Sequence, residues 1–505
     1  MRRIKFLTAT SLALLAASCT DNFEQYNTNP YAIYNAEPST LIPNMIEALM
    51  YTQQNSSQHT DQMVGSLGGY FVCSNRWGGQ NFDTFNAPEN WNAVPWNDSY
   101  SHLINIFDIE ASTGRQGHFW AMAQMLKAAV LMRVADCYGP IPYSSIADRS
   151  FHTAYDGGEE VYRNIIADLR HSADILTQYV AANPQSRPLA DIDLVYQGDY
   201  GLWARLAASL ALRAAVRTGN REAAEQICAA GGLIEENSQN ALIRTGGQRN
   251  PYQLSAGSWG DLRANSSIVD YMVGYADPRT SEYFTTSTFS GQTGQYVGMP
   301  IGMAGFDKND VAGYSLPNFE EQEPLPIFLA AETSFLKAEC ALRGWGVGGS
   351  AQSHYEQGIR LSMSQHGVGA SQTDSYIADR ERTPASHTND PRGNNYSRKT
   401  TVKIAWGADG ESHNLERIIT QKWIANWPMG LEAWAEWRRT GFPELQPTKD
   451  NLNSQVVTNT DRGLRRLRYP YSERDLNGAN YTRAVQALGG PDNEATELFW
   501  AKKDN

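Results

Sequence analysis

Residues 325–368 read LPIFLAAETSFLKAECALRGWGVGGSAQSHYEQGIRLSMSQHGV. Pro326 suits the first turn of a helix, because the N–H that proline lacks would have no partner there. Apolar or small side chains then recur every three or four residues and share one helical face, at Ile327, Ala331, Phe335, Ala338 and Leu342. We therefore predict a helix that begins at Pro326 and ends at the glycine-rich turn 344–349.

A second helix is predicted after that turn, because Tyr355, Ile359 and Met363 follow one another at intervals of four residues. Small side chains, such as Ala330 and Ala341, let the two helices approach closely as one tetratricopeptide-like hairpin. Such a hairpin cannot bury its apolar face alone, so other hairpins must stack on it. The expected fold class is all-α, with stacked tetratricopeptide-like hairpins.

The rest of the chain alternates between helical patterns and loop-rich stretches. Further helices are predicted at 39–49, 96–107, 119–138, 159–179, 200–217, 222–230 and 418–440. Large loop insertions are predicted near 65–95, 232–325 and 367–412, within a single domain that spans residues 39–505. The segment 296–300 reads as a short strand, and the C-terminal tail as irregular. Loops on a rigid helical frame are where binding usually occurs.

The composition narrows the class of partner. The chain has 505 residues, 41% of them hydrophobic, and a formal net charge of −12. A strongly acidic chain is a poor partner for the phosphate backbone, so we predict no nucleic-acid binding. Its 13 Trp and 25 Tyr residues supply many aromatic rings, and Trp beside Asn, Gly and Asp in loops suits sugar recognition.

The N-terminus reads as a targeting segment. Basic residues precede an apolar stretch at 6–17, which is too short to cross a membrane as a helix. Residues 1–18 are therefore predicted to be a signal peptide. Small residues before Cys19 resemble a lipobox, so we predict lipidation of Cys19 and an extended tether over residues 19–38; the alternative is a plain signal peptide with a chance cysteine. An acylated Cys19 would anchor the protein to a membrane.

The four remaining cysteines show no metal or redox motif. Cys73, Cys137, Cys228 and Cys340 form no C-x-x-C pair, which leaves zinc and thioredoxin-type chemistry without support. The last three lie in helical patterns and are expected to be small buried apolar residues. A disulfide between two of the four remains open at this stage.

Several segments together resemble one protein family. They are YGPIPYSS at 138–145, WARLAASLALRAAVR at 203–217, DPR at 277–279, AAETSFLKAECALRGW at 330–345, YEQGIRLSM at 355–363, QKWIANWPMGLEAWAEWRRTGFPEL at 421–445 and RLRYPYSERDLNGANYTRAV at 466–485. This order resembles the SusD/RagB family of Bacteroidetes outer-membrane lipoproteins, in its SusD-like branch. The resemblance implies a surface-exposed nutrient-binding lipoprotein of the cell outer membrane. It also implies a non-enzymatic role: capturing an oligosaccharide, or peptides in some members, for a SusC-like TonB-dependent transporter.

Ligand binding is predicted in the loop-rich insert 68–100. A sugar site needs exposed aromatic platforms with amide, carboxylate and guanidinium groups around them. The expected platforms are Trp77, Trp91 and Tyr70, and the expected polar groups are Asn75, Arg76, Asn81 and Asp83. A second candidate surface comprises Tyr252, Trp259 and Tyr296. The alternative for these aromatic residues is packing beneath the loops.

Other readings of the sequence have less support. A glycoside hydrolase needs two carboxylates across a cleft, whereas the carboxylates at 320–323 read as solvated loop charge and Glu432 and Glu436 as members of helix salt bridges. The motif Gly344-x-Gly346-x-x-Gly349 follows a helix rather than a strand, so it does not indicate a nucleotide site. The resemblance leaves room for a structural Ca²⁺ ion, but no D-x-D-x-D-G loop occurs; we name no metal ligand and no cofactor. Four arginines at 462–468 are expected to form internal salt bridges or to contact the transporter.

Overall fold

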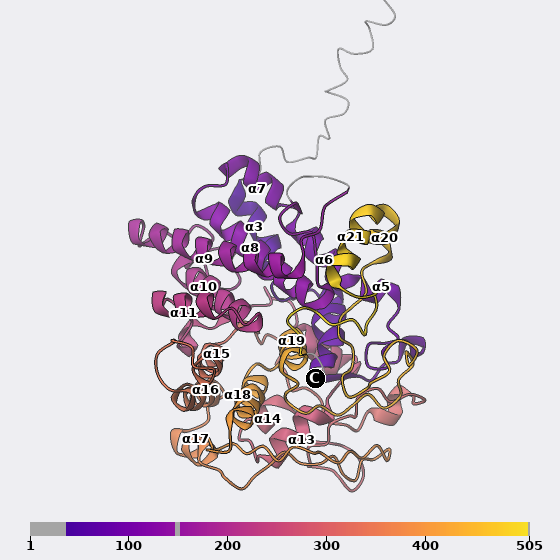
Figure 1. Ribbon diagram of the computed structural model, residues 1–505. Helices are drawn as coiled ribbons and strands as arrows, with labels where there is room; N and C mark the ends of the chain where they lie inside the picture. Colours follow the sequence, from indigo (N-terminus) through magenta and orange to yellow (C-terminus); the bar gives the residue numbers. More distant parts are fainter. Residues whose placement is uncertain (1–36, 147–151, 503–505) are drawn as a thin grey trace, which may run out of the picture.

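The computed structural model describes residues 37–146 and 152–502, and these are mostly helical (Figure 1). The predicted signal peptide and lipidation site, Cys19, lie outside the described residues. The helices of the first half are α3 (Pro38–Glu47), α4 (Gln54–Ser57), α5 (Glu89–Asn92), α6 (Val94–Leu103), α7 (Ile106–Thr113), α8 (Gly117–Tyr138), α9 (Gly158–Ala182), α10 (Tyr200–Arg217) and α11 (Arg221–Ala230). Those of the second half are α12 (Pro251–Gln253), α13 (Ser266–Gly274), α14 (Thr280–Tyr283), α15 (Ala330–Leu342), α16 (Ala351–Gln365), α17 (Ala370–Ile377), α18 (Glu411–Ala425), α19 (Gly430–Thr440), α20 (Tyr471–Leu476) and α21 (Gly478–Leu488).

Strands and single helical turns complete the described part. Strand β1 (Phe71–Cys73) pairs antiparallel with β3 (Leu262–Ala264), and β2 (Ala241–Ile243) pairs antiparallel with β4 (Leu325–Phe328). The short turns are η1 (Gln58–Met63), η2 (Val64–Gly68), η3 (Trp77–Gly79), η5 (Asn237–Gln239), η6 (Leu254–Ser258) and η7 (Lys308–Val311). Both sheets are short and join segments far apart in the sequence.

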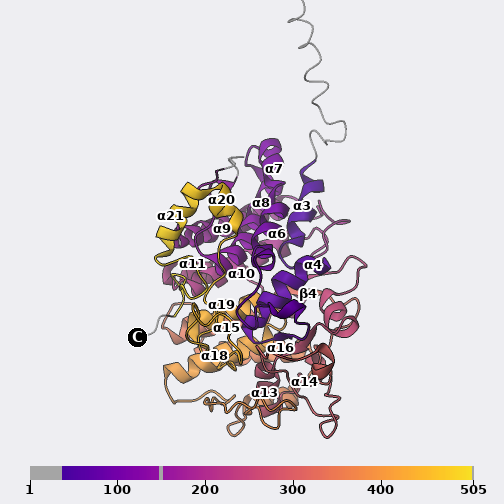
Figure 2. The same cartoon turned by 90° about the vertical axis from the view of Figure 1, so that its right-hand side faces the viewer.

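The long helices form a stack of hairpins, which confirms the predicted fold class. Helix α8 packs on α9, α9 on α10, and α10 on α11 and α15. The stack continues through α16, α17 and α18, and runs down one side of the molecule in Figure 1. In both views the C-terminal helices α20 and α21 lie toward the end of the molecule that carries α7 (Figure 2).

Local sequence explains where these helices begin. The carboxylate of Asp199 accepts hydrogen bonds from the N–H groups of Gly201 and Leu202, and so caps α10. Ser350 caps α16, because its hydroxyl accepts a hydrogen bond from the N–H of Ser353. Each cap provides a partner for an N–H that has none within the helix.

The stretch that predicted the fold differs in one detail. Pro326 lies in strand β4 rather than in a helix, and α15 begins at Ala330. Proline is tolerated there because its position faces a register irregularity between Ala241 and Leu242 of β2. Ile327 is still buried, as predicted, but from the strand. Alternating burial cannot be read in this short strand, because all four of its residues are buried.

Four other predictions need correction. The predicted helix 418–440 is two helices, α18 and α19, separated at 426–429 by a segment that contains Pro428. Helices α13 and α17 lie in stretches predicted as loops, and α20 and α21 lie in the tail predicted as irregular. In the predicted strand 296–300, only Met299 forms a bridge, with Asn265.

A close approach between backbones joins the N-terminal part to α19. A Cβ atom on Gly430 would lie 2.5 Å from the Cα of Gly65, and one on Gly68 would lie 2.6 Å from the carbonyl oxygen of Gly430. Gly430 and Gly68 therefore need glycine for steric reasons, whereas a Cβ atom on Gly65 would lie 3.1 Å from the Cα of Gly430, a tight contact. The contact fixes η2 against the start of α19.

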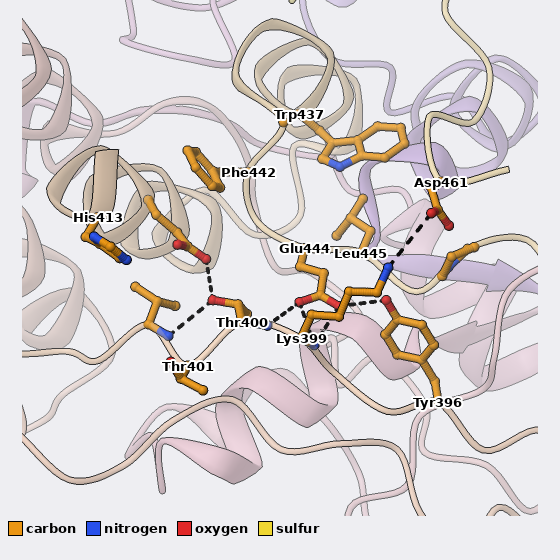
Figure 3. A pocket seen from close by; sticks show the side chains of 14 residues that line it. Tyr396, Lys399, Thr400, Thr401, His413, Trp437, Phe442, Glu444, Leu445 and Asp461 are labelled. Carbon is orange, nitrogen blue, oxygen red and sulfur yellow. Dashed lines mark hydrogen bonds and ion pairs between the residues drawn. The ribbon is translucent and has the colours of Figure 1, made fainter. Parts of the chain in front are cut away.

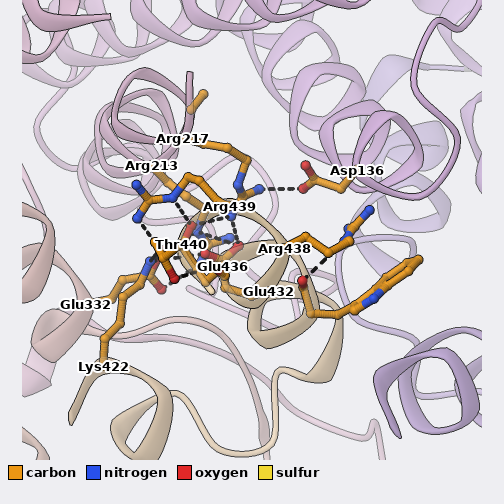
Figure 4. A network of polar contacts seen from close by, with 12 residues as sticks. Asp136, Arg213, Arg217, Glu332, Lys422, Glu432, Glu436, Arg438, Arg439 and Thr440 are labelled. Atoms are coloured by element: carbon orange, nitrogen blue, oxygen red, sulfur yellow. Dashed lines mark hydrogen bonds and ion pairs between the residues drawn. The ribbon is translucent and has the colours of Figure 1, made fainter. Parts of the chain in front are cut away.

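Charged side chains are buried where the hairpins meet (Figure 4). Arg213 and Arg217 of α10 contact Glu332 of α15 and Asp136 of α8, at 2.7 Å and 2.5 Å. Arg217 also contacts Glu432 of α19 at 2.5 Å. None of these five residues is more than 8% exposed.

The same buried charge network continues into α18 and the end of α19. Lys422 lies 3.2 Å from Glu432 and 3.1 Å from Glu436. Arg439 pairs with Glu436 at 2.7 Å and with Glu339 of α15 at 2.6 Å. Glu432 and Glu436 thus form salt bridges, as predicted, but inside the stack. The arginines lower the pKa of Glu432 to about 2, against the opposing effect of burial.

The four arginines predicted to form internal salt bridges lie close to acidic side chains. Arg462 and Arg465 pair with Glu497, Arg466 pairs with Asp492, and Arg468 contacts Glu494. This confirms the predicted internal salt bridges.

The four described cysteines are free, with Cys73, Cys137 and Cys340 buried and Cys228 partly exposed. Within residues 37–146 and 152–502, no helix is both long and apolar enough to cross a membrane.

Candidate ligand-binding site

Strand pairing between β1 and β3 brings two distant loops together. In the antiparallel register, Cys73 lies opposite Leu262, so the residues after β1 meet those before β3. The Ser74 N–H donates to the carbonyl of Asp261 at 2.8 Å, and the Ser74 hydroxyl donates to the carbonyl of Gly260 at 2.7 Å. The residues that follow β1, among them Trp77, therefore lie next to those that precede β3, among them Trp259, and together they form one candidate site.

The carboxylate of Asp261 holds this site together. Its Oδ1 accepts a hydrogen bond from the Asn75 amide at 3.2 Å and contacts the ammonium of Lys308 at 2.5 Å. Its Oδ2 accepts from the Gln58 amide at 3.5 Å. Asp261 is 6% exposed, so four chain segments converge on a nearly buried charge. We call these residues, with Arg76, Trp77, Trp91 and Trp259, the loop site.

A small separate core supports one side of the loop site. Val72, Met299, Ile301, Val311 and Tyr314 are buried in it, together with Val297, Met303 and Phe306. The guanidinium of Arg76 lies over the Phe306 ring, 5.7 Å from its centroid. The Nε of Arg76 is buried and has no hydrogen-bond partner in the described part of the chain.

Trp77 and Trp91 pack edge to face in the loop site. Their ring centroids are 5.2 Å apart with an interplanar angle of 87°, and Trp91 makes a similar contact with His59 at 5.4 Å. Trp77 has a positive φ of 36°, and its N–H donates to the Asn75 side chain at 3.3 Å. Both indoles are half-buried, which leaves part of each ring surface accessible.

Trp259 is the most exposed aromatic ring of the loop site, at 43%. The turn η6 places it, and its N–H donates to the carbonyl of Leu254 at 2.9 Å. Exposing this much indole to water is unfavourable unless something covers it. The ring is therefore suited to stack against the apolar face of a ligand.

Four predicted residues are buried and cannot present their side chains at the surface. Tyr70 and Tyr252 are 0% exposed, and Asn81 and Asp83 are 2% exposed. The Tyr70 hydroxyl donates to the carbonyl of Trp423, and its ring stacks on that indole at 5.6 Å. These predictions of exposed groups are wrong because all four side chains pack into the interior of the protein.

Asn81 and Asp83 instead shape the loop from inside. Asp83 accepts hydrogen bonds from the Ser66 hydroxyl at 2.6 Å and the Cys73 N–H at 2.7 Å. Burial raises its pKa to about 6. Asn81 accepts from the N–H and the hydroxyl of Thr84, both at 2.9 Å. Tyr296 is half-buried and packs against the main hydrophobic core.

Sequence reasoning missed Asp261, Lys308 and His59. Each lies outside the aromatic-rich insert, in a stretch of ordinary composition. The only local signal was the dipeptide Gly260-Asp261 directly after Trp259, which favours a turn. Their role depends on strand pairing across some 190 residues, which no local pattern reveals.

The loop site can bind polar ligands but shows no arrangement for bond cleavage. Asp261 is the one acidic residue of the loop site as defined above, and its carboxylate already contacts Lys308 and Asn75. Among the described residues, no group of three or more His, Cys, Asp or Glu side chains is placed to hold a metal ion. Stacking and hydrogen bonding are the interactions that these residues offer.

Comparison with known proteins places the chain in a family. Residues 22–501 match the family model of SusD-like proteins, described as SusD and RagB outer membrane lipoproteins. A SusD-like protein from Bacteroides thetaiotaomicron is 33% identical with a TM-score of 0.88, covering 93% of this chain and 99% of that one. A SusD homologue from Bacteroides uniformis is 36% identical with a TM-score of 0.84, covering 92% and 99%.

A chitin-binding SusD homologue from Flavobacterium johnsoniae is 33% identical with a TM-score of 0.86, and the match covers 92% of this chain and 98% of that one. A search of curated proteins finds no match. This chain belongs to the SusD/RagB family. It is therefore a nutrient-binding lipoprotein of the outer membrane, and its role is binding rather than catalysis.

Proposed function

We propose that this protein captures an oligosaccharide at the loop site and delivers it to a SusC-like TonB-dependent transporter. The observation that carries the proposal is the exposed indole of Trp259 on a frame shared with Arg76 and Trp77. Sugars offer apolar C–H faces to aromatic rings and hydroxyls to guanidinium and amide groups. Chitin binding by a related protein supports a glycan ligand.

The proposal includes the membrane anchor. Lipidation of Cys19 would leave the tether of residues 20–36 between the membrane and the first described residue, Glu37. An acylated anchor keeps the loop site close to a transporter in the same membrane, which raises its effective concentration there. Release of the protein from the outer membrane by Cys19→Ala would test this step.

The test of glycan capture is a binding assay on an array of oligosaccharides with the full-length chain in detergent. A Trp77→Ala, Trp259→Ala double variant should lose at least about tenfold in affinity, because large aromatic side chains dominate such contacts. Trp345→Ala is a matched control, since Trp345 is partly exposed at the turn between α15 and α16. Glycan binding that survives the double change would exclude the loop site. Selective binding of peptides alone would show that the ligand is a peptide rather than an oligosaccharide.

Delivery to a transporter has its own test. The chain, tagged at its C-terminus, should co-purify with a TonB-dependent transporter from the outer membrane of its own cells. Because complex formation and glycan binding are separate properties, the Trp77→Ala, Trp259→Ala variant should still co-purify. Purification of the chain alone under mild conditions would contradict the proposed partnership.

A further inference from the structure

A second pocket lies away from the loop site, between the segment 396–402 and the end of α19 (Figure 3). Its volume is about 460 Å³, within the range of about 300–1,000 Å³ usual for small-molecule sites. None of its lining residues belongs to the loop site. We call it the α19 pocket.

The carboxylate of Glu444 fixes the walls of the α19 pocket, and hydrogen bonds from the protein occupy both of its oxygens. Glu444 accepts the backbone N–H groups of Lys399 and Thr400 at 2.9 Å and 2.6 Å, and the Tyr396 hydroxyl at 2.6 Å. These bonds tie the 396–402 segment to the 441–447 segment. The pocket is therefore held open by its own hydrogen bonds, and Glu444 has little capacity left for a ligand.

A second carboxylate in the α19 pocket is not saturated. Glu416 is 8% exposed, and its Oε1 accepts the Thr400 hydroxyl at 2.5 Å. In the described part of the chain, no residue donates a hydrogen bond to its Oε2. Burial raises the pKa of Glu416, and the nearby Glu444 raises it further. This oxygen is not among the fully buried atoms, so it is free to accept a hydrogen bond from water or from a donor group of a ligand.

The charge and shape of the lining indicate which donor fits. Three carboxylates, of Glu416, Glu444 and Asp461, line the pocket together with the ammonium of Lys399 and the imidazole of His413. That ammonium lies 4.0 Å from Asp461 at an exposed position, where Figure 3 shows the two side chains approaching each other. The rings of Trp437, Phe442 and Tyr396 complete the lining. Acidic groups beside aromatic rings attract an organic cation.

We infer that the α19 pocket is a second ligand site, for a sugar unit that carries a protonated primary amine. The ammonium donates to Oε2 of Glu416, and the ring packs on Trp437 and Phe442. An ammonium group brings three donors and no acceptor, which matches a carboxylate oxygen that has no other partner. The site is independent of glycan capture at the loop site.

The test uses the full-length chain in detergent and four probes: glucosamine, glucose, N-acetylglucosamine and lysine amide. Affinities are measured by calorimetric titration, with saturation-transfer NMR as a second readout. Glucosamine is expected to bind roughly tenfold more tightly than glucose or N-acetylglucosamine, because only glucosamine carries the ammonium. Equal binding of glucosamine and glucose would overturn the inference.

Two variants assign the binding to this pocket. Glu416→Gln keeps an oxygen for the Thr400 hydroxyl but removes the charge, and should weaken glucosamine binding roughly tenfold. Glu411→Gln, an exposed change on the same helix α18, is the matched control and should leave the affinity unchanged. Unchanged binding by Glu416→Gln would overturn the inference.

A third variant, Lys399→Gln, tests the electrostatic argument with a change that should not disturb folding. Lys399 is 78% exposed as a side chain, so Lys399→Gln should fold normally. It removes the competing cation and should tighten glucosamine binding by roughly twofold. Weaker binding would contradict the electrostatic argument. Tighter binding of lysine amide than of glucosamine would overturn the assignment to a sugar.

Discussion

The buried charge network and the loop site use polar groups in opposite ways. In the network, Arg217 contacts both Asp136 and Glu432 at 2.5 Å and is fully enclosed. In the loop site, by contrast, Trp259 is left 43% exposed and the Trp77 and Trp91 rings are only half-buried. The first arrangement fixes helices relative to one another. The second leaves aromatic surface exposed, which a ligand can cover.

Breaking the buried charge network should have the largest effect on stability. Glu432→Gln removes the charge that faces Arg217 and Lys422, leaving buried cations uncompensated. We expect the free energy of unfolding to fall by about 3–5 kcal/mol. Denaturant unfolding measures it, with exposed Glu222→Gln as the control. A change as small as that of the control would show that the network does not stabilise the stack.

His387 tests the same comparison, because it makes buried ionic contacts outside the buried charge network. Its imidazole lies 3.1 Å from both Asp270 and Asp390; Arg398 also faces Asp270, and the Tyr314 hydroxyl donates to Asp390. The two carboxylates raise the pKa of His387 to about 9, although burial alone would lower it. A raised folded-state pKa means that this stabilisation is complete below about pH 6.5, the pKa of an ordinary histidine. It is lost as the pH rises through about 9.

The pH dependence of unfolding measures this contribution. Between pH 6.5 and 10, the parent should lose about 3 kcal/mol more than His387→Gln, whose amide does not titrate. The difference between the two proteins isolates His387 from other titrating groups. Parallel curves for both proteins would contradict a raised pKa.

A steric change tests the frame without altering charge. Gly430→Ala would place a Cβ atom 2.5 Å from the Cα of Gly65, so the backbones of α19 and η2 must separate. We expect a loss of about 1–3 kcal/mol in the free energy of unfolding. Gly478→Ala is the control, because its Cβ would meet no atom within 4 Å. Equal stability of the two variants would show that the close approach is not rigid.

The smallest effect on stability is expected in the loop site. Trp259→Ala should change the free energy of unfolding by no more than about 0.5 kcal/mol, because the ring is exposed and makes no recorded aromatic contact. The same change should weaken ligand binding, which separates the two regions by function. A loss of stability comparable to that of Gly430→Ala would mean that Trp259 belongs to the frame.

Helical spacing predicted most of the stack but not its polar interior. The helix predicted at 200–217 matches α10, because its small and apolar residues alternate with few breaks. Pro326 was misplaced because a four-residue buried strand has no visible period. The network was not foreseen, since Glu432 and Glu436 read equally well as exposed helix charges, and their partners lie on other hairpins.

The loop site was predicted in part for a similar reason. Aromatic and polar enrichment points to Trp77 and Trp259, which the fold leaves partly exposed, and equally to Tyr70 and Asp83, which the fold buries. Composition marks a region, whereas exposure is decided by tertiary packing. Asp261 and Lys308 could be recognised only after β1 and β3 were paired.

The pairing of β1 with β3 has a consequence for how the protein matures. The helical hairpins are built from neighbouring segments and can form early, whereas Cys73 and Leu262 must close a loop of nearly 190 residues. The residues that hold the loop site together therefore meet only late in folding. A newly exported chain can acquire its helices well before it acquires any affinity for its ligand, so ligand binding reports that maturation is complete.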